Sequence, residues 1–358
     1  MNNDLEQLIA DATPFNALPL LIHVLSRDNV SVRQSMSSLS RTQYIQNYLS
    51  NTLILRELKD VIIALAERGM KVIVLKGAAL TLNLYHDLGL RPMRDADLLI
   101  HRKDLARVIE IMCHLGYRRC LSSARFGAET FQGEVVCIKD GNFPVVIEPH
   151  WTLGPEYPYS GRIQADGLWQ RATRINLDGI DTLALCPEDS LLHLCLHQLQ
   201  HCQNFELIPA CDITELIRHY KDRFDWRSFL NRIVEFKLCL PVQYSLKMTS
   251  EVFHLPIPGF VFNELSSYKP GRLEHKIFTW LSSQNNTIGS RNLAKLLTIP
   301  WIGRKLRYLG SVLFPSREWL MSYYPRSSTG PLGLYSRHMK NVVLTGIEVI
   351  FRFVFRGK

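Results

Sequence analysis

Two short apolar runs inside a long helical pattern constrain the fold of this chain most strongly. Residues 71–75 are rich in β-branched side chains, and residues 96–100 are almost entirely apolar; both runs have the length typical of a buried strand. Residues 1–70 show apolar side chains at helical spacing, and after Gly77 that spacing returns. We therefore expect a small α/β unit, at roughly residues 70–160, between helices on both sides.

The next strand-like runs predict a hairpin. Residues 131–139 and 144–151 flank the tripeptide Asp140-Gly141-Asn142, and Asp-Gly between two apolar runs is a strong hairpin signal. Between the second strand and this hairpin, we expect a helix that Asp104 caps and Gly116 ends. A loop rich in Gly, Pro and Tyr then leads into a helical pattern. The helices expected there cover residues 187–203, 213–220, 226–236 and 242–253.

Composition excludes two classes of protein. With 358 residues, 46% hydrophobic and 21% charged, the chain is too apolar to stay disordered. It has no stretch of roughly 18 uninterrupted apolar residues, which a membrane-spanning helix needs. The acidic N-terminus lacks the basic and apolar regions of a signal peptide, and the 8 cysteines form no Cys-x-x-Cys pair. These features predict a cytoplasmic protein with free thiols.

The net charge of +9 is concentrated in the last part of the chain. Residues 285–358 contain 12 Lys and Arg but only Glu318 and Glu348, a net charge of +10, which leaves −1 for residues 1–284. This asymmetry favours an anionic partner for the basic region: a membrane surface, nucleic acid or an acidic protein. Nucleic acid is the less favoured partner, because the body shows no basic excess.

Two interpretations of the basic region stay open. Up to about Tyr335, apolar residues recur at the spacing of a packed core. Residues 342–358 mix apolar side chains with Arg352 and Arg356, and this stretch either packs on the body or lies on the inner face of an anionic membrane as a peripheral helix. We favour membrane contact for residues 352–358 only. The core-like residues are Trp301, Leu306, Leu309, Leu313, Trp319 and Leu320.

The chemistry is expected around two aspartates. Asp95 and Asp97 lie two positions apart, so on a strand both carboxylates face the same side. Like charges at that distance resist ionisation unless a cation neutralises them, and Mg²⁺ is the usual cation for oxygen ligands. Glu148, in the second arm of the hairpin, can lie beside this strand as a third acid. His150 follows two residues later and faces the same way.

A glycine turn precedes these acids. Lys76 and Gly77 separate the first strand from the next helix, where backbone N–H groups and the positive end of the helix dipole can approach a phosphate chain. Two metal ions held by the acids can bridge the attacking and leaving oxygens of an in-line displacement. The pattern therefore indicates phosphoryl or nucleotidyl transfer.

These segments resemble the uncharacterised nucleotidyltransferase family of the polymerase-β-like superfamily. The resemblance rests on VLKGAAL, RDADLLI and VIEPHW, continues through PEDSLLHLCLHQLQH, ACDITELI and DWRSFL, and covers roughly residues 55–260. It implies an α+β fold with a minimal mixed sheet flanked by helices, two Mg²⁺ ions and an NTP donor. It also implies that Gly77 binds phosphate, that Asp95 and Asp97 bind the metals, and that Glu148 is the third acid.

The sequence departs from the family pattern in three ways. The usual Gly-Ser is Gly77-Ala78 here, so a hydroxyl that often touches phosphate is absent. The gap from Gly77 to Asp95 is longer than in compact members. The third acid is Glu148 rather than an aspartate, which adds one methylene. The departures bear on the donor site more than on the metal pair.

Several nearby residues have both a functional and a structural interpretation. Lys76 either neutralises phosphate or pairs with one of the acids. Arg91 and Arg94 either bind the triphosphate, as a guanidinium does well, or pair with Asp95 or Asp87. We expect nucleotide binding from Lys76, Gly77, Arg91 and Arg94.

Three histidines, His193, His197 and His201, follow one another at four-residue spacing on a predicted helix. The outer two lie about 12 Å apart, so the three alone cannot form a tetrahedral zinc site. We interpret them as packing residues that face the transferase unit, with His197 and His150 as candidates for the acceptor pocket. Asp212 is expected to cap this region or to pair with one of the histidines.

We divide the chain into an N-terminal helical region (1–70), a nucleotidyltransferase core (71–160), a helical domain (161–284) and a basic helical extension (285–358). The first hypothesis is a Mg²⁺-dependent enzyme that moves an NMP group from an NTP to a hydroxyl on a small molecule, sugar or protein. Glu148 then completes the metal site or acts as general base. The alternative is a catalytically silent binding or scaffold protein that docks through its basic region. The presence of all three acids favours the enzyme.

Overall fold

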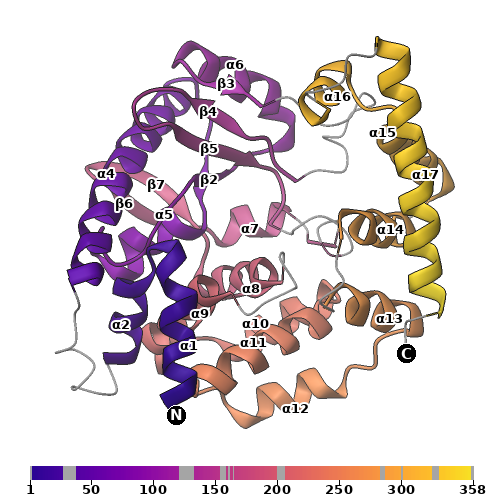
Figure 1. Ribbon diagram of the computed structural model, residues 1–358. Coiled ribbons are helices and arrows are strands. Elements are labelled where there is room, and N and C mark those ends of the chain that lie inside the picture. Colours follow the sequence, from indigo (N-terminus) through magenta and orange to yellow (C-terminus); the bar gives the residue numbers. More distant parts are fainter. Residues whose placement is uncertain are drawn as a thin grey trace.

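One mixed sheet organises the chain (Figure 1). The computed structural model describes residues 2–26, 38–120, 133–153, 159, 162–163, 165–199, 206–282, 287–299, 301–324 and 330–355. Within them, seven strands join in the order β3-β4-β5-β2-β1-β7-β6. Their bounds are Ile73–Val74 (β1), Ala96–Leu99 (β2), Arg118–Arg119 (β3), Cys137–Lys139 (β4), Val145–His150 (β5), Thr173–Leu177 (β6) and Ile180–Ala184 (β7). The predicted α+β fold is confirmed.

Alternating side chains of the central strands enter two separate cores. Val74 of β1 and Leu98 of β2 pack with α4 (Ser38–Ala66) and α6 (Leu105–His114). Ile73 and Leu99, their neighbours in sequence, pack with helices on the opposite face. Because successive strand residues point to opposite faces, a strand covered on both sides must be apolar throughout, which is why both runs stood out in the sequence.

Helices from both halves of the chain cover the second face. They are α1 (Asn2–Ala12), α2 (Leu18–Ser26), α8 (Pro187–Gln198), α9 (Leu207–Tyr220), α10 (Trp226–Glu235) and α11 (Cys239–Phe253). Their buried side chains form a single core with Leu80 of α5 (Lys76–Leu80). The predicted helices in these regions are confirmed within the described residues. In the described part of the chain, seven cysteines are present as free thiols.

The hairpin of β6 and β7 is not among the predicted elements. We expected helical structure after the loop that follows residue 151, but β6 and β7 pair antiparallel, and β7 adds to β1 in parallel. The turn is Asp178-Gly179, with positive φ at both residues, and it carries the same Asp-Gly signal as the predicted hairpin. The sheet thus continues past residue 160, while the division into four regions stays a prediction.

The start of α6 also differs from the expectation. A 3-10 turn, Arg102–Asp104, precedes the helix, and the Asp104 side chain makes no capping hydrogen bond. The predicted cap is therefore wrong. Gly116 does lie just beyond the helix, with φ of +90°, a conformation that glycine adopts without strain.

The C-terminal helices are α12 (Gly259–Ser267), α13 (Arg272–Leu281), α14 (Ile288–Thr298), α15 (Ile302–Leu313), α16 (Arg317–Tyr323) and α17 (Pro331–Phe355). α12 packs on α10 and α11, whereas α14 to α17 form the side of the molecule farthest from α1 and α2 (Figure 1). α17 is the outermost, and α14, α15 and α16 pack against it. The predicted helical C-terminal region is confirmed. In the described parts of the chain, no helix has both the length and the apolar character to cross a membrane.

Candidate active site

Two parallel strands bring the predicted acids together. β2 and β5 pair so that Asp97 lies opposite Glu148, and His150 follows on the same side of β5. One ligand atom from each of Asp97, Glu148 and His150 lies within 4.8 Å of the others. We call these three residues the β2–β5 site. The expectation that Glu148 lies beside the strand of the aspartates is confirmed.

Asp97 is the centre of this site and is 2% exposed. Its Oδ1 accepts hydrogen bonds from Lys76 Nζ at 3.3 Å and from His150 Nε2 at 2.7 Å. Burial alone would raise the pKa of Asp97, but the charges of Lys76 and His150 outweigh burial and hold that pKa well below its usual range. Asp97 is therefore ionised. Lys76 thus pairs with an acid, as one of its two interpretations expects, and nucleotide binding by Lys76 stays a prediction.

His150 supplies the second positive charge. Its Nδ1 lies 3.3 Å from Glu134 Oε2, and its Nε2 lies 3.7 Å from Glu148 Oε2. Burial would lower the pKa of His150, yet the charge and hydrogen bond of Asp97 and the hydrogen bond of Glu148 raise it to about 9. The imidazole is thus protonated at neutral pH. Because a metal-bound imidazole must be neutral, metal coordination by His150 would release this proton.

Asp95 lies next to the site but not on the strand. β2 begins at Ala96, so the expectation that both aspartates occupy one strand is wrong by one residue. Burial, reinforced by the negative charges of Asp97 and Glu148, raises the pKa of Asp95 to about 6. Of the two aspartates, only Asp95 therefore shows the expected resistance to ionisation. Its role as a metal ligand stays a prediction.

Gly77 is needed for the packing of an arginine. A Cβ at this position would lie 2.5 Å from Arg91 Nη1 and 3.2 Å from Met93 Cγ. Lys76, just before it, has φ of +39°, so the turn into α5 is tight as well as crowded. The close approach of Arg91 accounts for the glycine, and phosphate binding by Gly77 stays a prediction.

Arg91 forms a buried ion pair with Asp212 of α9. Its Nε donates to Asp212 Oδ1 at 2.9 Å and its Nη2 to Oδ2 at 2.8 Å, while Tyr85 Oη donates to Oδ1 at 2.8 Å. The expected pairing of Arg91 with Asp95 or Asp87 is wrong, as is that of Asp212 with a histidine. This pair fixes the loop before β2 to α9, and contact between Arg91 and triphosphate stays a prediction.

Arg94 has a different environment. Its exposed guanidinium lies over the ring of Phe15, 5.2 Å from the centroid. Asp87, one of its expected partners, instead accepts hydrogen bonds from Tyr44 Oη and the Gly89 N–H. Among the described contacts, the expected ion pair of Arg94 therefore does not form, and its role in nucleotide binding stays a prediction.

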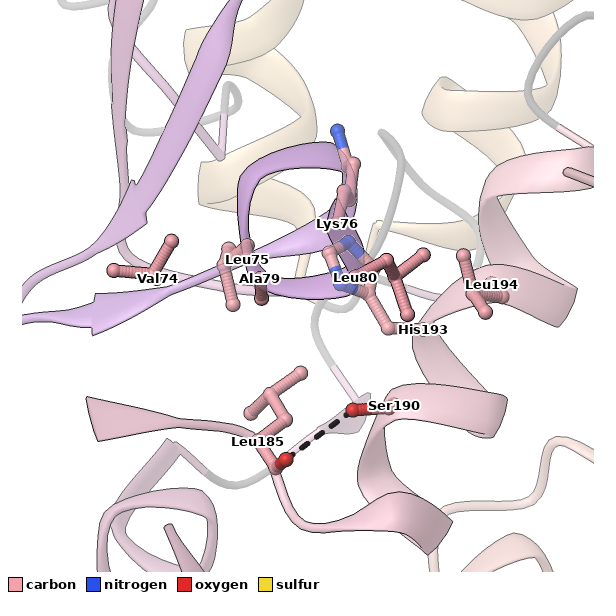
Figure 2. A pocket seen from close by; sticks show the side chains of 9 residues that line it. All are labelled: Val74, Leu75, Lys76, Ala79, Leu80, Leu185, Ser190, His193 and Leu194. Carbon is pink, nitrogen blue, oxygen red and sulfur yellow. Dashed lines mark hydrogen bonds between the residues drawn. The ribbon is translucent and has the colours of Figure 1, made fainter. Parts of the chain in front are cut away.

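A small pocket lies between α5 and α8 (Figure 2). The view shows His193 and Leu194 of α8 facing Lys76 and Leu80 of α5. Burial, with the positive charges of Lys76 and His197, holds the pKa of His193 well below its usual range, so this histidine is neutral. The prediction that the histidines face the transferase unit is confirmed for His193.

The other two histidines have different outcomes. His197 is half-buried on α8, and its place in an acceptor pocket stays a prediction. His201 lies outside the described residues.

Two further residues were missed. Glu134 pairs as an isolated bridge with His150; its position in the first arm of the predicted hairpin was the available signal. Lys295 of α14 is 5% exposed, and burial lowers its pKa to about 7 while Glu134 opposes that shift. Glu134, the acid that opposes the shift at Lys295, is also the acid 3.3 Å from His150 Nδ1. Nothing local in the sequence distinguishes Lys295 from other basic residues of the C-terminal region.

A comparison with protein-family models agrees with the resemblance. The family model described as "Uncharacterised nucleotidyltransferase" matches residues 2–254, which end before α12. Among solved structures, the chain is similar to an antigenic nucleotidyltransferase-like protein from Paracoccidioides brasiliensis, at 21% sequence identity and a TM-score of 0.31; the match covers 57% of this chain and 96% of that chain. A search of curated proteins gives no match.

Proposed function

Because the chain belongs to the uncharacterised nucleotidyltransferase family, we propose that it moves an NMP group from an NTP to a hydroxyl-bearing acceptor in a Mg²⁺-dependent reaction. The observation that carries the proposal is the β2–β5 site, where a buried and ionised Asp97 lies opposite Glu148. Asp95 adds a third carboxylate close enough to repel the other two. A fold gains no stability from three mutually repelling carboxylates, so their grouping favours a cation-binding role.

The donor set fits a hard divalent cation. Carboxylate oxygens are the ligands that Mg²⁺ prefers, and Asp97, Glu148 and His150 can each direct one atom to a common point. When bound, the metal would neutralise the acids and stabilise the charge of the transferred phosphoryl group. Asp97 and Glu148 are the proposed ligands, with Asp95 completing a two-ion site.

Lys76 and Glu148 have roles that follow from their positions. Four acids, with Asp97 first, raise the pKa of Lys76 against the effect of burial, so its ammonium stays charged. On its flexible stem, this group would be free to bind a triphosphate oxygen if a cation took its place beside Asp97. His150 is protonated and unsuited to accept a proton at neutral pH, so Glu148 is the proposed base that draws the proton from the acceptor hydroxyl.

One observation favours the second candidate, a catalytically silent binding protein. Asp97 is already neutralised by Lys76 and His150, so this part of the site is electrostatically balanced without a metal. In a silent binding protein, Lys76 and His150 stay paired with Asp97. The protein then binds its partners through other surfaces.

A thermal-shift screen of ATP, GTP, CTP and UTP separates the two candidates. A ligand that binds only the folded state raises stability by about 2.7 kcal/mol at a hundredfold excess over its Kd. The enzyme predicts a rise in Tm for at least one NTP with Mg²⁺, abolished by chelator and by Asp97→Asn. Asp140→Asn, an exposed acid at the tip of the β4–β5 hairpin, is the control and should retain the shift. No shift with any of the four NTPs would favour the silent protein.

A further inference from the structure

The outer side of α17 leaves a continuous apolar surface exposed. Six side chains of this helix are between 50% and 62% exposed, and their spacing of three and four residues places them on one side. We call them the α17 face: Val343, Leu344, Ile347, Ile350, Phe351 and Val354. Isolated exposed apolar residues are ordinary, whereas a contiguous patch of this kind marks a contact surface.

The opposite side of α17 already packs on the protein. Leu334, His338 and Val349 are buried there, and a Cβ at Gly289 of α14 would lie 2.9 Å from both Thr345 Cγ2 and Val349 Cγ2. The helix is therefore held against the C-terminal region by one side. Folding of the described chain does not require the α17 face to be apolar.

Two exposed cations lie on α17 just before this face. Arg337 and Lys340 are exposed on α17, and the acid Glu348 forms an ion pair with Arg352. The whole region from 285 to 358 has a net charge of +10. Two copies of such a surface repel each other, so the charge disfavours self-association and favours an anionic partner.

The neighbouring helix repeats the combination of exposed apolar and basic side chains. Trp301, at the start of α15, is 80% exposed, and Ile302 and Leu306 are 73% and 61% exposed. Arg304 and Arg307, also exposed, alternate with them. An indole ring close to basic residues suits the boundary between lipid headgroups and hydrocarbon.

We propose that the α17 face docks the protein on a bilayer that contains acidic phospholipids. The apolar side chains enter the headgroup boundary, and the basic residues bind the lipid phosphates. From the sequence we favour membrane contact for residues 352–358 only, whereas the exposed face reaches back to Val343. This proposal does not depend on nucleotidyl transfer, because these helices follow the residues that match the family.

The test is co-sedimentation of the full-length protein with vesicles of phosphatidylcholine alone or mixed with phosphatidylglycerol. We expect sedimentation with the acidic vesicles at about 0.05 M salt and a marked loss at about 0.5 M, because screening shortens the reach of surface charge. The double variant Ile347→Glu/Phe351→Glu should bind at least tenfold more weakly. The matched control Ile45→Glu/Leu49→Glu, at the same spacing and with similar exposure on α4, should bind as the wild type does.

A second variant tests the charge separately. Arg337→Gln/Lys340→Gln removes two exposed cations and no apolar contact, so it keeps the proposal testable even if the glutamate variant fails to fold. Each removed charge should weaken binding to acidic vesicles about fivefold at low salt. The proposal is overturned if the wild type does not sediment with acidic vesicles at low salt, or if either variant of α17 binds as tightly as the wild type. A dimer that the glutamate variant disrupts, without vesicle binding, would assign the face to a second copy.

Discussion

The β2–β5 site and the α17 face differ in how their charges are balanced. In the site, the buried carboxylate of Asp97 is matched by Lys76 and His150 within the same fold. Around the α17 face, exposed basic residues outnumber acids, and the apolar side chains remain in contact with solvent. Burial removes water from a charge and makes a partner necessary, whereas an exposed cation needs none. The site is therefore organised internally, while the face is suited to an external surface.

The largest effect is expected at the buried pair of Arg91 and Asp212. Asp212→Asn leaves the guanidinium buried without a counter-charge and should lower the free energy of unfolding by about 3–5 kcal/mol, measured by urea denaturation. Asp140→Asn is the control, because its exposed pair with Arg118 should contribute nothing measurable. Similar losses in both variants would contradict the view that burial determines how much an ion pair contributes to the free energy of unfolding.

The two aspartates of the motif should respond with opposite signs. Asp97→Asn removes the shared partner of Lys76 and His150 and should lower the free energy of unfolding by roughly 2 kcal/mol. Asp95→Asn removes a carboxylate that its neighbours repel, so stability should stay the same or rise. Urea denaturation at neutral pH compares them. Equal destabilisation would mean that Asp95 has a structural partner of its own.

The pH dependence of stability should reflect His150. Its pKa is about 9 in the folded protein, against 6.5 for an ordinary histidine, so between these values the folded state binds more protons than the unfolded chain. The contribution of His150 to the free energy of unfolding should therefore be greatest below pH 6.5 and be lost as pH rises through 9. Lys295, whose pKa is lowered to about 7, contributes in the opposite direction above that pH, so the effect of His150 is read as the difference between wild type and His150→Gln. In urea denaturation in metal-free buffer, the advantage of the wild type over His150→Gln should shrink across this window. A difference that stays constant across the window would assign the pH dependence to another group.

The smallest effect on stability is expected on the α17 face. Ile347→Glu/Phe351→Glu changes exposed side chains and should alter the free energy of unfolding by no more than roughly 0.5 kcal/mol. Val349→Ala, on the packed side of the same helix, should cost roughly 1–2 kcal/mol because it removes two buried methyl groups. Thermal denaturation of the two variants gives the comparison. A larger loss from the exposed pair would show that the face is part of the folded core.

The parts of the molecule that the sequence predicted depend on local patterns. The two central strands and the hairpin follow from apolar runs and an Asp-Gly turn, and they suffice to place Glu148 beside Asp97. The second hairpin had the same Asp-Gly signal, but its outer strand β6 is half exposed, with polar Arg174 and Asn176 between apolar residues. Its alternation was weaker evidence than a continuous apolar run.

The partners of individual charged residues could not be predicted in this way. Arg91 and Asp212 are 121 positions apart, and only the packing of α9 on the sheet brings them together. Lys76 had two interpretations, because the choice depends on which charges tertiary structure places within a few ångströms. Spacing along the chain identifies candidate residues, whereas their pairing is a property of the assembled fold.

The most direct test of the central claim is isothermal titration calorimetry of the preformed Mg²⁺ complex of the NTP that gives the largest thermal shift into the protein in Mg²⁺ buffer. The account predicts saturable binding of this complex to the wild-type chain and to Asp140→Asn. It also predicts that Asp97→Asn, shown by circular dichroism to be folded, loses that binding. Binding of equal affinity in Asp97→Asn, or no binding of any of the four NTPs to the wild-type chain, would contradict a nucleotidyl-transfer site between β2 and β5.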